Sequence, residues 1–190
     1  MTIADGGIII VAQPRTGSTN LQKSICSYYK KKIIFEPNFM LDQVYDSNKD
    51  VIKMFPYHPL YHNNTQEYDY NIILNKIKQF NTIILLSRKN KKEQTDSMYV
   101  VKVKHEGIYD YPWYDSQVDP DDKIYKAYED FFKAATEVHN RLASDLNLEI
   151  NYYEDVFENK KLNIDIGLDL DFFSEGLKLR NESKQHKTLI

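Results

Sequence analysis

The sequence has one cysteine and no long apolar run, and its charges nearly balance. A single cysteine, Cys26, excludes an intramolecular disulfide and is typical of a reducing compartment. No stretch approaches the roughly 20 apolar residues of a membrane span, and the N-terminal residues show no signal pattern, so we expect a cytoplasmic protein. A net charge of −3 gives no case for nucleic acid or a membrane surface as partner.

Strand-like and helix-like segments alternate along the 190 residues, and we expect one domain over residues 1–190. The alternation predicts a three-layer α/β/α fold around a central parallel sheet of about five strands. Strands are expected at 7–12, 33–35, 51–55, 82–86 and 148–152, and the clearest helices at about 18–31, 70–80 and 121–146.

Two expectations concern helix faces. On the 121–146 helix, apolar residues step by three and four, which predicts a face packed on the sheet. Its members are Ile124, Tyr128, Phe131, Ala135, Val138 and Leu142. His139 and Arg141 fall off that face and are expected to be exposed. Cys26, on the 18–31 helix, is expected to be a buried structural thiol and not a nucleophile.

The segment Gln13–Thr19 joins the first predicted strand to the first helix. Such a junction binds anions, because the first helical N–H groups have no partner within the helix and the helix dipole is positive there. Gly17 allows close approach of the backbone to a phosphate, and Arg15 adds a permanent charge. Hydroxyl donors come from Thr16, Ser18 and Thr19. The loop lacks the Gly-Lys pair of an ATPase loop.

The order Gln-Pro-Arg-Thr-Gly-Ser-Thr over residues 13–19 resembles the 5′-phosphosulfate-binding loop of the sulfotransferases. Those enzymes use 3′-phosphoadenosine 5′-phosphosulfate (PAPS) as sulfuryl donor. The resemblance implies a P-loop-like sulfotransferase fold. It also implies that the donor is bound by residues of this loop and of the first helical turn, namely Arg15, Thr16, Gly17, Ser18, Thr19 and Asn20.

A second motif follows the predicted strand at 82–86. Arg88 leaves that strand, and Ser97 lies nine positions later on the next helix, so a guanidinium and a hydroxyl can converge on one phosphate. The pattern Arg-x-Asn-Lys-x-x-Gln-x-x-Ser is similar to the 3′-phosphate site of sulfotransferases, most of all the bacterial trehalose-sulfotransferase-like (Stf-zero) and nodulation-type branch. This resemblance implies that Arg88 and Ser97 hold the 3′-phosphate of PAPS.

The strand at 51–55 resembles the one that carries a Lys and the general-base His in cytosolic sulfotransferases. Lys53 matches the family Lys, which implies that it neutralises the transferring group, but Phe55 stands where the His would be. The base is therefore left open between Glu36, His58 and His62. Glu36 follows the second strand, where the related bacterial branch takes its carboxylate, and a neutral imidazole suits proton removal from an alcohol.

Three further segments keep two interpretations each. Aromatic and acidic residues alternate over 105–122, which suits a polyhydroxylated acceptor or an acidic surface loop. Arg180 and Lys184 lie in a basic C-terminal stretch, which in relatives closes over the 3′-phosphate but could equally be a frayed tail. Asp155, in a Tyr-Glu-Asp-Val segment, is expected to cap a helix and not to act in catalysis.

Taken together, these residues predict sulfuryl transfer from PAPS to an acceptor hydroxyl, with a carbohydrate or another small alcohol as partner. No metal site is expected, because His and Cys do not cluster with metal-ligand spacing. In the proposed chemistry Arg15 stabilises the leaving phosphate oxygen. Two alternatives remain: a non-catalytic relative that binds PAPS or its product adenosine 3′,5′-bisphosphate (PAP), and a divergent P-loop nucleotide kinase.

Overall fold

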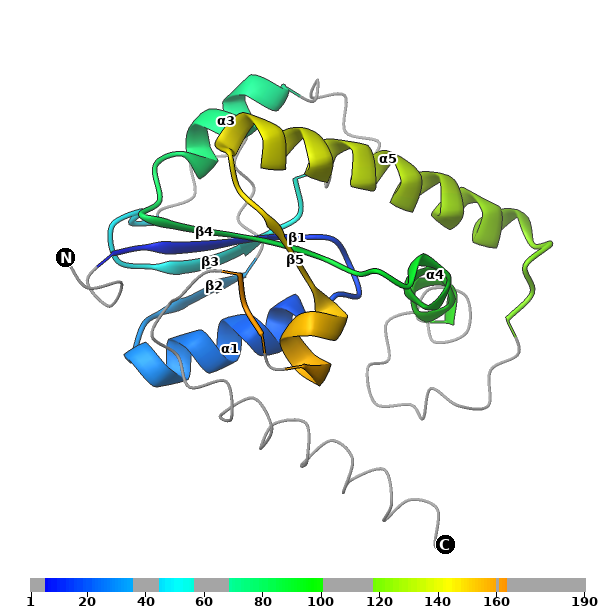
Figure 1. Ribbon diagram of the computed structural model, residues 1–190, viewed down its shortest axis with the longest axis horizontal. Coiled ribbons are helices and arrows are strands. Elements are labelled where there is room, and N and C mark those ends of the chain that lie inside the picture. Colours follow the sequence, from blue (N-terminus) through cyan, green and yellow to red (C-terminus); the bar gives the residue numbers. More distant parts are fainter. Residues whose placement is uncertain (1–5, 36–44, 57–68, 101–117, 160, 164–190) are drawn as a thin grey trace, which may run out of the picture.

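The computed structural model describes residues 6–35, 45–56, 69–100, 118–159 and 161–163 (Figure 1). Within them the chain forms one five-stranded sheet in which every neighbouring pair is parallel. The strands are β1 (Ile8–Ala12), β2 (Ile33–Phe35), β3 (Val51–Met54), β4 (Thr82–Ser87) and β5 (Ile150–Tyr152). They lie in the order β2-β3-β1-β4-β5, and central β1 is buried along its whole length. An apolar, β-branched sequence such as Ile-Ile-Ile-Val-Ala suits a strand covered on both faces.

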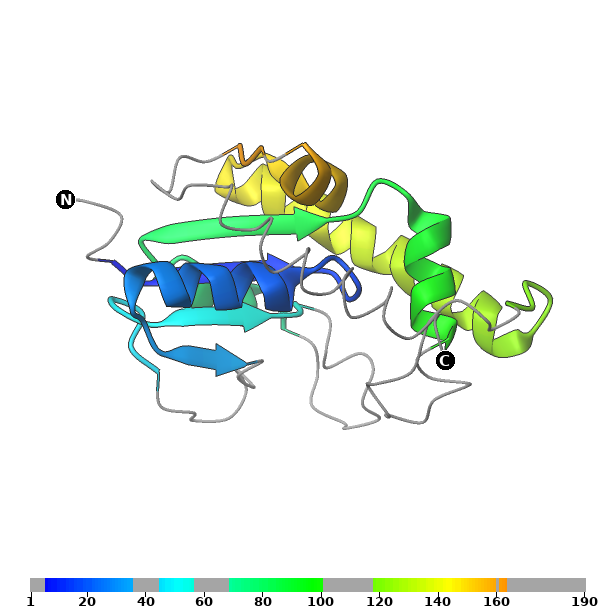
Figure 2. The same cartoon turned by 90° about the horizontal axis from the view of Figure 1, so that it is seen from below.

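Helices cover both faces of the sheet, as Figures 1 and 2 show. α1 (Ser18–Tyr29) packs on one face together with a π-helical turn, η3 (Glu154–Glu158). α3 (Tyr70–Ile77) and α5 (Lys123–Leu146) pack on the other face, and α4 (Lys91–Tyr99) lies beside α5. The predicted three-layer α/β/α architecture with a parallel sheet is therefore confirmed. None of the helices in the described ranges is long and apolar enough to span a membrane.

The face that α5 buries differs from the predicted one by one position. The buried residues of this helix are Tyr125, Tyr128, Phe132, Ala135, His139 and Leu142. Ile124 is 47% exposed, whereas His139 is 0% exposed, so the expectation that His139 faces solvent was wrong. The sheet accepts His139 because its Nε2 lies 3.1 Å from the carbonyl oxygen of Val11. Arg141 is exposed, as expected.

Cys26 is buried in the layer between α1 and the sheet, with 3% of its surface exposed. Burial raises the pKa of its thiol to about 11, although the charge of Lys31 opposes the shift. A thiol with that pKa stays protonated near neutral pH and is a poor nucleophile. The expectation of a buried structural cysteine is confirmed.

The strand order places a topological switch point between β1 and β4. The chain passes from β1 through α1 to β2 on one side, and later from β3 through α3 to β4 on the other side. In open parallel sheets, ligands bind outside the carboxyl ends of the strands at such a point. Two strand-to-helix junctions meet there, β1–α1 and β4–α4.

Candidate functional site

The β1–α1 junction is a tight loop with two residues in the left-handed region. Arg15 has φ 63° and Gly17 has φ 72°, and each follows a residue of negative φ. This alternation turns successive N–H groups toward a common centre, which is a geometry that binds anions. In the part of the chain that the structure describes, the amides of Gly17, Ser18 and Thr19 donate to no acceptor. The amide of Asn20 is already bonded to the Gly17 carbonyl oxygen at 2.9 Å.

Only glycine fits at position 17. A Cβ atom there would lie 2.7 Å from Cε2 of Phe157 and 3.2 Å from Cδ2 of Tyr153. The positive φ adds a second cost for any side chain. Thr16, just before it, is fully buried, and its hydroxyl donates to the Gln13 carbonyl oxygen at 2.7 Å. The Thr16 hydroxyl thus closes the loop from inside, so the part of Thr16 left for a ligand is its amide.

Four of the predicted site residues meet at this junction. Arg15 Nε donates to Ser97 Oγ at 2.9 Å, which joins the loop to α4 across 82 residues of sequence. Lys53 Nζ, on β3, donates to Thr19 Oγ1 at 2.9 Å. Lys53 is 5% exposed, and its Nζ lies 5.0 Å from the centre of the Phe55 ring. Two cations are therefore held at fixed places around the start of α1.

Arg88, at the β4–α4 junction, is paired with carboxylates. Its guanidinium pairs with the carboxylates of Glu93 and Glu154 and lies 4.8 Å from the centre of the Tyr153 ring. Ser97 instead bonds Arg15, as described above. The joint role of Arg88 and Ser97 at one phosphate stays a prediction.

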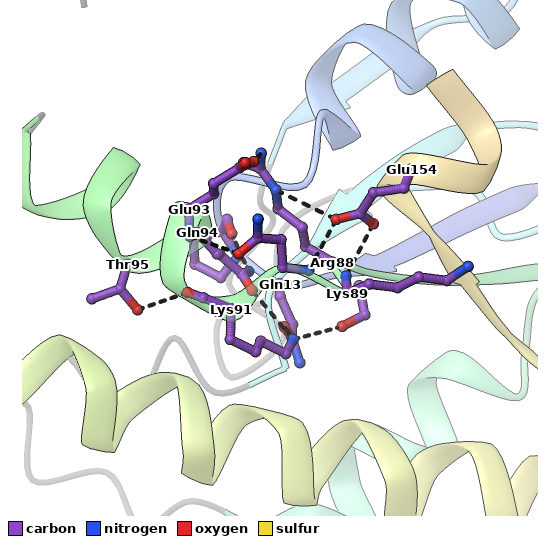
Figure 3. A network of polar contacts seen from close by, with 11 residues as sticks. Gln13, Arg88, Lys89, Lys91, Glu93, Gln94, Thr95 and Glu154 are labelled. Atoms are coloured by element: carbon purple, nitrogen blue, oxygen red, sulfur yellow. Dashed lines mark hydrogen bonds and ion pairs between the residues drawn. The ribbon is translucent and has the colours of Figure 1, made fainter. Parts of the chain in front are cut away.

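The carboxylate of Glu154 lies at the β4–α4 junction (Figure 3). Its two carboxylate oxygens accept hydrogen bonds from the backbone amides of Lys89 and Asn90, each at 3.0 Å. Burial raises the pKa of Glu154, but those amides and the charge of Arg88 outweigh burial and hold the pKa below its ordinary value. The neighbouring Asp155 binds Lys89 Nζ at 2.7 Å. Asp155 lies inside η3 and is not its N-terminal cap, so the predicted capping role was wrong.

Lys91 is the polar centre that sequence reasoning missed. Its Nζ donates to Gln13 Oε1 at 2.6 Å, to Ser87 Oγ at 3.0 Å and to Gln94 Oε1 at 3.2 Å. Gln94 in turn donates to the carbonyl oxygen of Pro14 at 2.6 Å, so α4 holds the β1–α1 loop from behind. Burial lowers the pKa of Lys91 to about 8, against the charge of Glu154. The signal available in the sequence was the spacing of Lys91 and Gln94 on one helical face.

Several predicted residues lie outside the described ranges. They are the three candidate bases Glu36, His58 and His62, the basic residues Arg180 and Lys184, and most of the aromatic and acidic segment at 105–122. Within the ranges that are described, no group of three or more His, Cys, Asp or Glu could hold a metal ion.

Comparison with known proteins adds no relative to this picture. No family model, no curated protein and no solved structure matches the chain. Function is therefore inferred from the geometry of the site. That geometry offers converging amides, hydroxyls and two fixed cations at the switch point of a parallel sheet, which is a site for an oxyanion.

Proposed function

We propose that this chain is a PAPS-dependent sulfotransferase that moves a sulfuryl group to an acceptor hydroxyl. The observation that supports the proposal most is the 2.9 Å hydrogen bond from Arg15 Nε to Ser97 Oγ. It brings together the two sequence motifs that resemble the 5′-phosphosulfate and 3′-phosphate sites. The β1–α1 loop and α4 meet at the edge of the sheet where parallel α/β proteins bind their ligands.

The residues at the β1–α1 junction fit a phosphosulfate. PAPS supplies an activated sulfuryl group attached through an anhydride oxygen to a phosphate. The amides of Gly17, Ser18 and Thr19 suit phosphate oxygens, and the guanidinium of Arg15 suits the charge that develops on the bridging oxygen. Lys53, fixed by Thr19, places a second cation beside them. Fixed donors of this kind stabilise developing charge without reorganisation, as a magnesium ion does in kinases.

The proposal must account for the existing contacts of Arg88 and for the group that takes the acceptor proton. Arg88 binds a 3′-phosphate only by exchanging its contact with Glu93, because Glu154 is held in place by two amides. The proton of the acceptor hydroxyl passes to one of Glu36, His58 or His62 in this proposal. Phe55, at the position of the family histidine, supports the alternative of a PAP-binding protein without turnover.

The test is calorimetric titration with PAP, run beside ATP with magnesium. Wild type, Arg15→Ala and Arg88→Ala are compared with Arg141→Ala, which removes an exposed guanidinium on α5. We expect metal-independent PAP binding that falls about 100-fold in Arg15→Ala and about tenfold in Arg88→Ala, since charge-assisted hydrogen bonds are lost. Arg141→Ala is expected to bind as wild type does.

Three results would redirect the assignment. Binding of ATP–magnesium without PAP overturns it in favour of a kinase. PAP binding without transfer from PAPS to any alcohol supports the non-catalytic alternative. Equal losses in Arg15→Ala and Arg141→Ala show nonspecific charge attraction and contradict a donor site in the loop.

A further inference from the structure

Gln13, the first residue of the β1–α1 loop, is fully buried and makes a hydrogen bond with each of its polar atoms. Its backbone amide donates to the carbonyl oxygen of Leu86 at 3.0 Å, and its own carbonyl oxygen accepts from the Thr16 hydroxyl at 2.7 Å. Its side-chain nitrogen donates to Thr136 Oγ1 at 3.3 Å, and its Oε1 accepts from Lys91 Nζ at 2.6 Å. The start of the loop is therefore fixed by partners on β4, α5 and α4.

The direction of these hydrogen bonds turns two glutamine oxygens toward Lys91. Thr136 gives its own proton to a backbone carbonyl oxygen of α5, so its contact with Gln13 requires an N–H from the glutamine. Gln94 likewise uses its side-chain nitrogen, since the carbonyl oxygen of Pro14, 2.6 Å away, only accepts. The remaining oxygen of each glutamine accepts from Lys91 Nζ, at 2.6 Å for Gln13 and 3.2 Å for Gln94 (Figure 3).

The strength of this hold depends on the proton of Lys91. Hydrogen bonds from an ammonium are about twice as strong as those from a neutral donor. The three N–H groups of protonated Lys91 are donated to the two glutamine oxygens and to Ser87 Oγ. Burial lowers the pKa of Lys91 to about 8, against the charge of Glu154. A rise in pH through about 8 therefore weakens the link between α4 and the loop.

Other charged or titratable groups surround Lys91 on several elements. Glu154 acts from η3, and the side chains that line the same hollow in the surface are Arg88, Lys89, His139 and Tyr152. His139, on α5, has its pKa lowered to about 4 by burial and by the charge of Lys91, so it stays neutral above pH 7. The hydrogen bond to Asp155 raises the pKa of Lys89. On α4 itself, Lys92 and Glu93 bond Asp96 and Arg88.

We propose that protonated Lys91 is a positioning residue for the oxyanion that the β1–α1 loop binds. It holds Gln13 directly and Pro14 through Gln94, and both loop residues precede the turn of positive φ that directs the loop amides to a common centre. Lys91 acts without touching the anion, because its N–H groups are donated within the protein. The inference rests on the proposed function for the anion site in the loop, and it does not require sulfuryl transfer.

The probe is inorganic sulfate, whose charge does not change between pH 7 and pH 9. Binding to the full-length protein is followed at constant ionic strength by the carbon chemical shifts of Gly17, which remain observable where amide exchange is fast. Lys91→Met keeps the aliphatic stem and removes the N–H groups. Lys92→Met is the matched control, because it makes the same change at a neighbouring side chain that is 74% exposed. Gln94→Leu removes the contact with Pro14 and leaves the charge of Lys91 in place.

We expect sulfate to bind wild type about fivefold more weakly at pH 9 than at pH 7, because Lys91 loses most of its proton over that interval. Lys91→Met should bind about tenfold more weakly than wild type at pH 7 and show no further fall at pH 9. Lys92→Met should keep the affinity and the pH profile of wild type. Saturating sulfate should raise the pKa of Lys91, followed by its Cε chemical shift, because binding linkage is reciprocal.

Gln94→Leu separates positioning from attraction by charge alone. We expect this variant to bind sulfate more weakly as well, and Lys91→Met combined with Gln94→Leu to lose little more than the weaker single variant. Wild-type affinity in Gln94→Leu, or additive losses in the double variant, overturns the positioning role. So does a wild-type affinity that is equal at pH 7 and pH 9, which needs no variant to measure.

Two further results distinguish this inference from the proposed function. If sulfate leaves the Gly17 signals of wild type unchanged, the positioning role and the donor site in the loop are both overturned. If sulfate binds with the expected dependence on Lys91 but PAP does not bind, the positioning role is supported and the proposed sulfotransferase function is contradicted.

Discussion

Two strand-to-helix junctions lie side by side at the edge of this sheet, and they differ in whether their backbone amides have a hydrogen-bond acceptor. At β4–α4, the carboxylate of Glu154 accepts the amides of Lys89 and Asn90. At β1–α1, the amides of Gly17 to Thr19 find no acceptor in the described part of the chain. The first junction holds its own anion, and the second has the geometry to take one from solution.

The cations follow the same division. Arg88 and Lys89 bond carboxylates at β4–α4, whereas Arg15 and Lys53 bond the hydroxyls of Ser97 and Thr19 around β1–α1. The comparison teaches that a helix start at the switch point is not by itself a ligand site, because its chemistry depends on which long-range partner reaches it.

The largest effect on stability is expected at Gly17, where a side chain would clash with Phe157. Gly17→Ala places a Cβ at positive φ and against Phe157, and we expect it to lower the free energy of unfolding by ~3 kcal/mol. Urea unfolding measures this loss. Phe157→Leu in the same chain should recover part of it by giving the new methyl group space. A Gly17→Ala protein as stable as wild type would contradict the packing described for the loop.

The next effect concerns His139, whose buried ring contacts the Val11 carbonyl oxygen on β1. The folded pKa of His139 is about 4, below its ordinary 6.5, so the unfolded chain binds more protons between these values. Stability due to neutral His139 is present above pH 6.5 and is lost as the pH falls toward 4. Relative to His139→Asn, wild type should lose ~2 kcal/mol between pH 7 and pH 5. Urea unfolding at both pH values checks this, and parallel curves would contradict it.

A smaller effect is expected from Glu154→Gln, which would make the β4–α4 junction resemble the β1–α1 junction. Glu154→Gln leaves one amide and the guanidinium of Arg88 without their carboxylate, and we expect a loss of ~1.5 kcal/mol in urea unfolding. Added sulfate should restore more stability to this variant than to wild type, because the junction can then take an external anion. The control is Glu93→Gln, whose side chain is 58% exposed, and its expected loss is under about 0.5 kcal/mol. Equal sulfate effects in wild type and Glu154→Gln would show that Glu154 does not occupy an anion site.

The smallest effect sharpens the role of α4 in the loop. Ser97→Ala removes the acceptor of Arg15 Nε and should weaken PAP binding about fivefold, while Ser97→Thr keeps the hydroxyl and should restore most of the affinity. Calorimetric titration measures both variants. A Ser97→Thr protein as weak as Ser97→Ala would indicate a steric and not a hydrogen-bonding role.

The parts of the fold that sequence predicts are those encoded locally. The buried strands β1 and β4 are continuous apolar runs, and the loop between β1 and α1 is marked by Pro14 and Gly17 within a few residues. The face of α5 was misplaced because two apolar faces share Tyr128, Ala135 and Leu142. The true face is selected by tertiary contacts, among them the bond between His139 and Val11.

The long-range polar partners could not be predicted. Glu154 lies 64 residues after the amide of Asn90 that it accepts, and a charge pattern does not specify which carboxylate reaches which helix start. Lys91 stands between Asn90 and Lys92 in a run that looks solvated, yet it is only partly exposed and bonds three neutral oxygens. The sequence therefore indicated the residue types of the site but not how Arg88 and Ser97 divide between the two junctions.

The packing of Phe157 and Tyr153 against Gly17 also orders events during synthesis. β1 and α1 leave the ribosome well before η3, the element whose aromatic side chains pack against Gly17. Contacts between such distant positions form late, because the intervening chain must close first. A nascent chain that has released β1 through α4 therefore carries the whole loop sequence without its final shape. The ability to hold an anion therefore arises only after η3 has been synthesised and has docked against the loop.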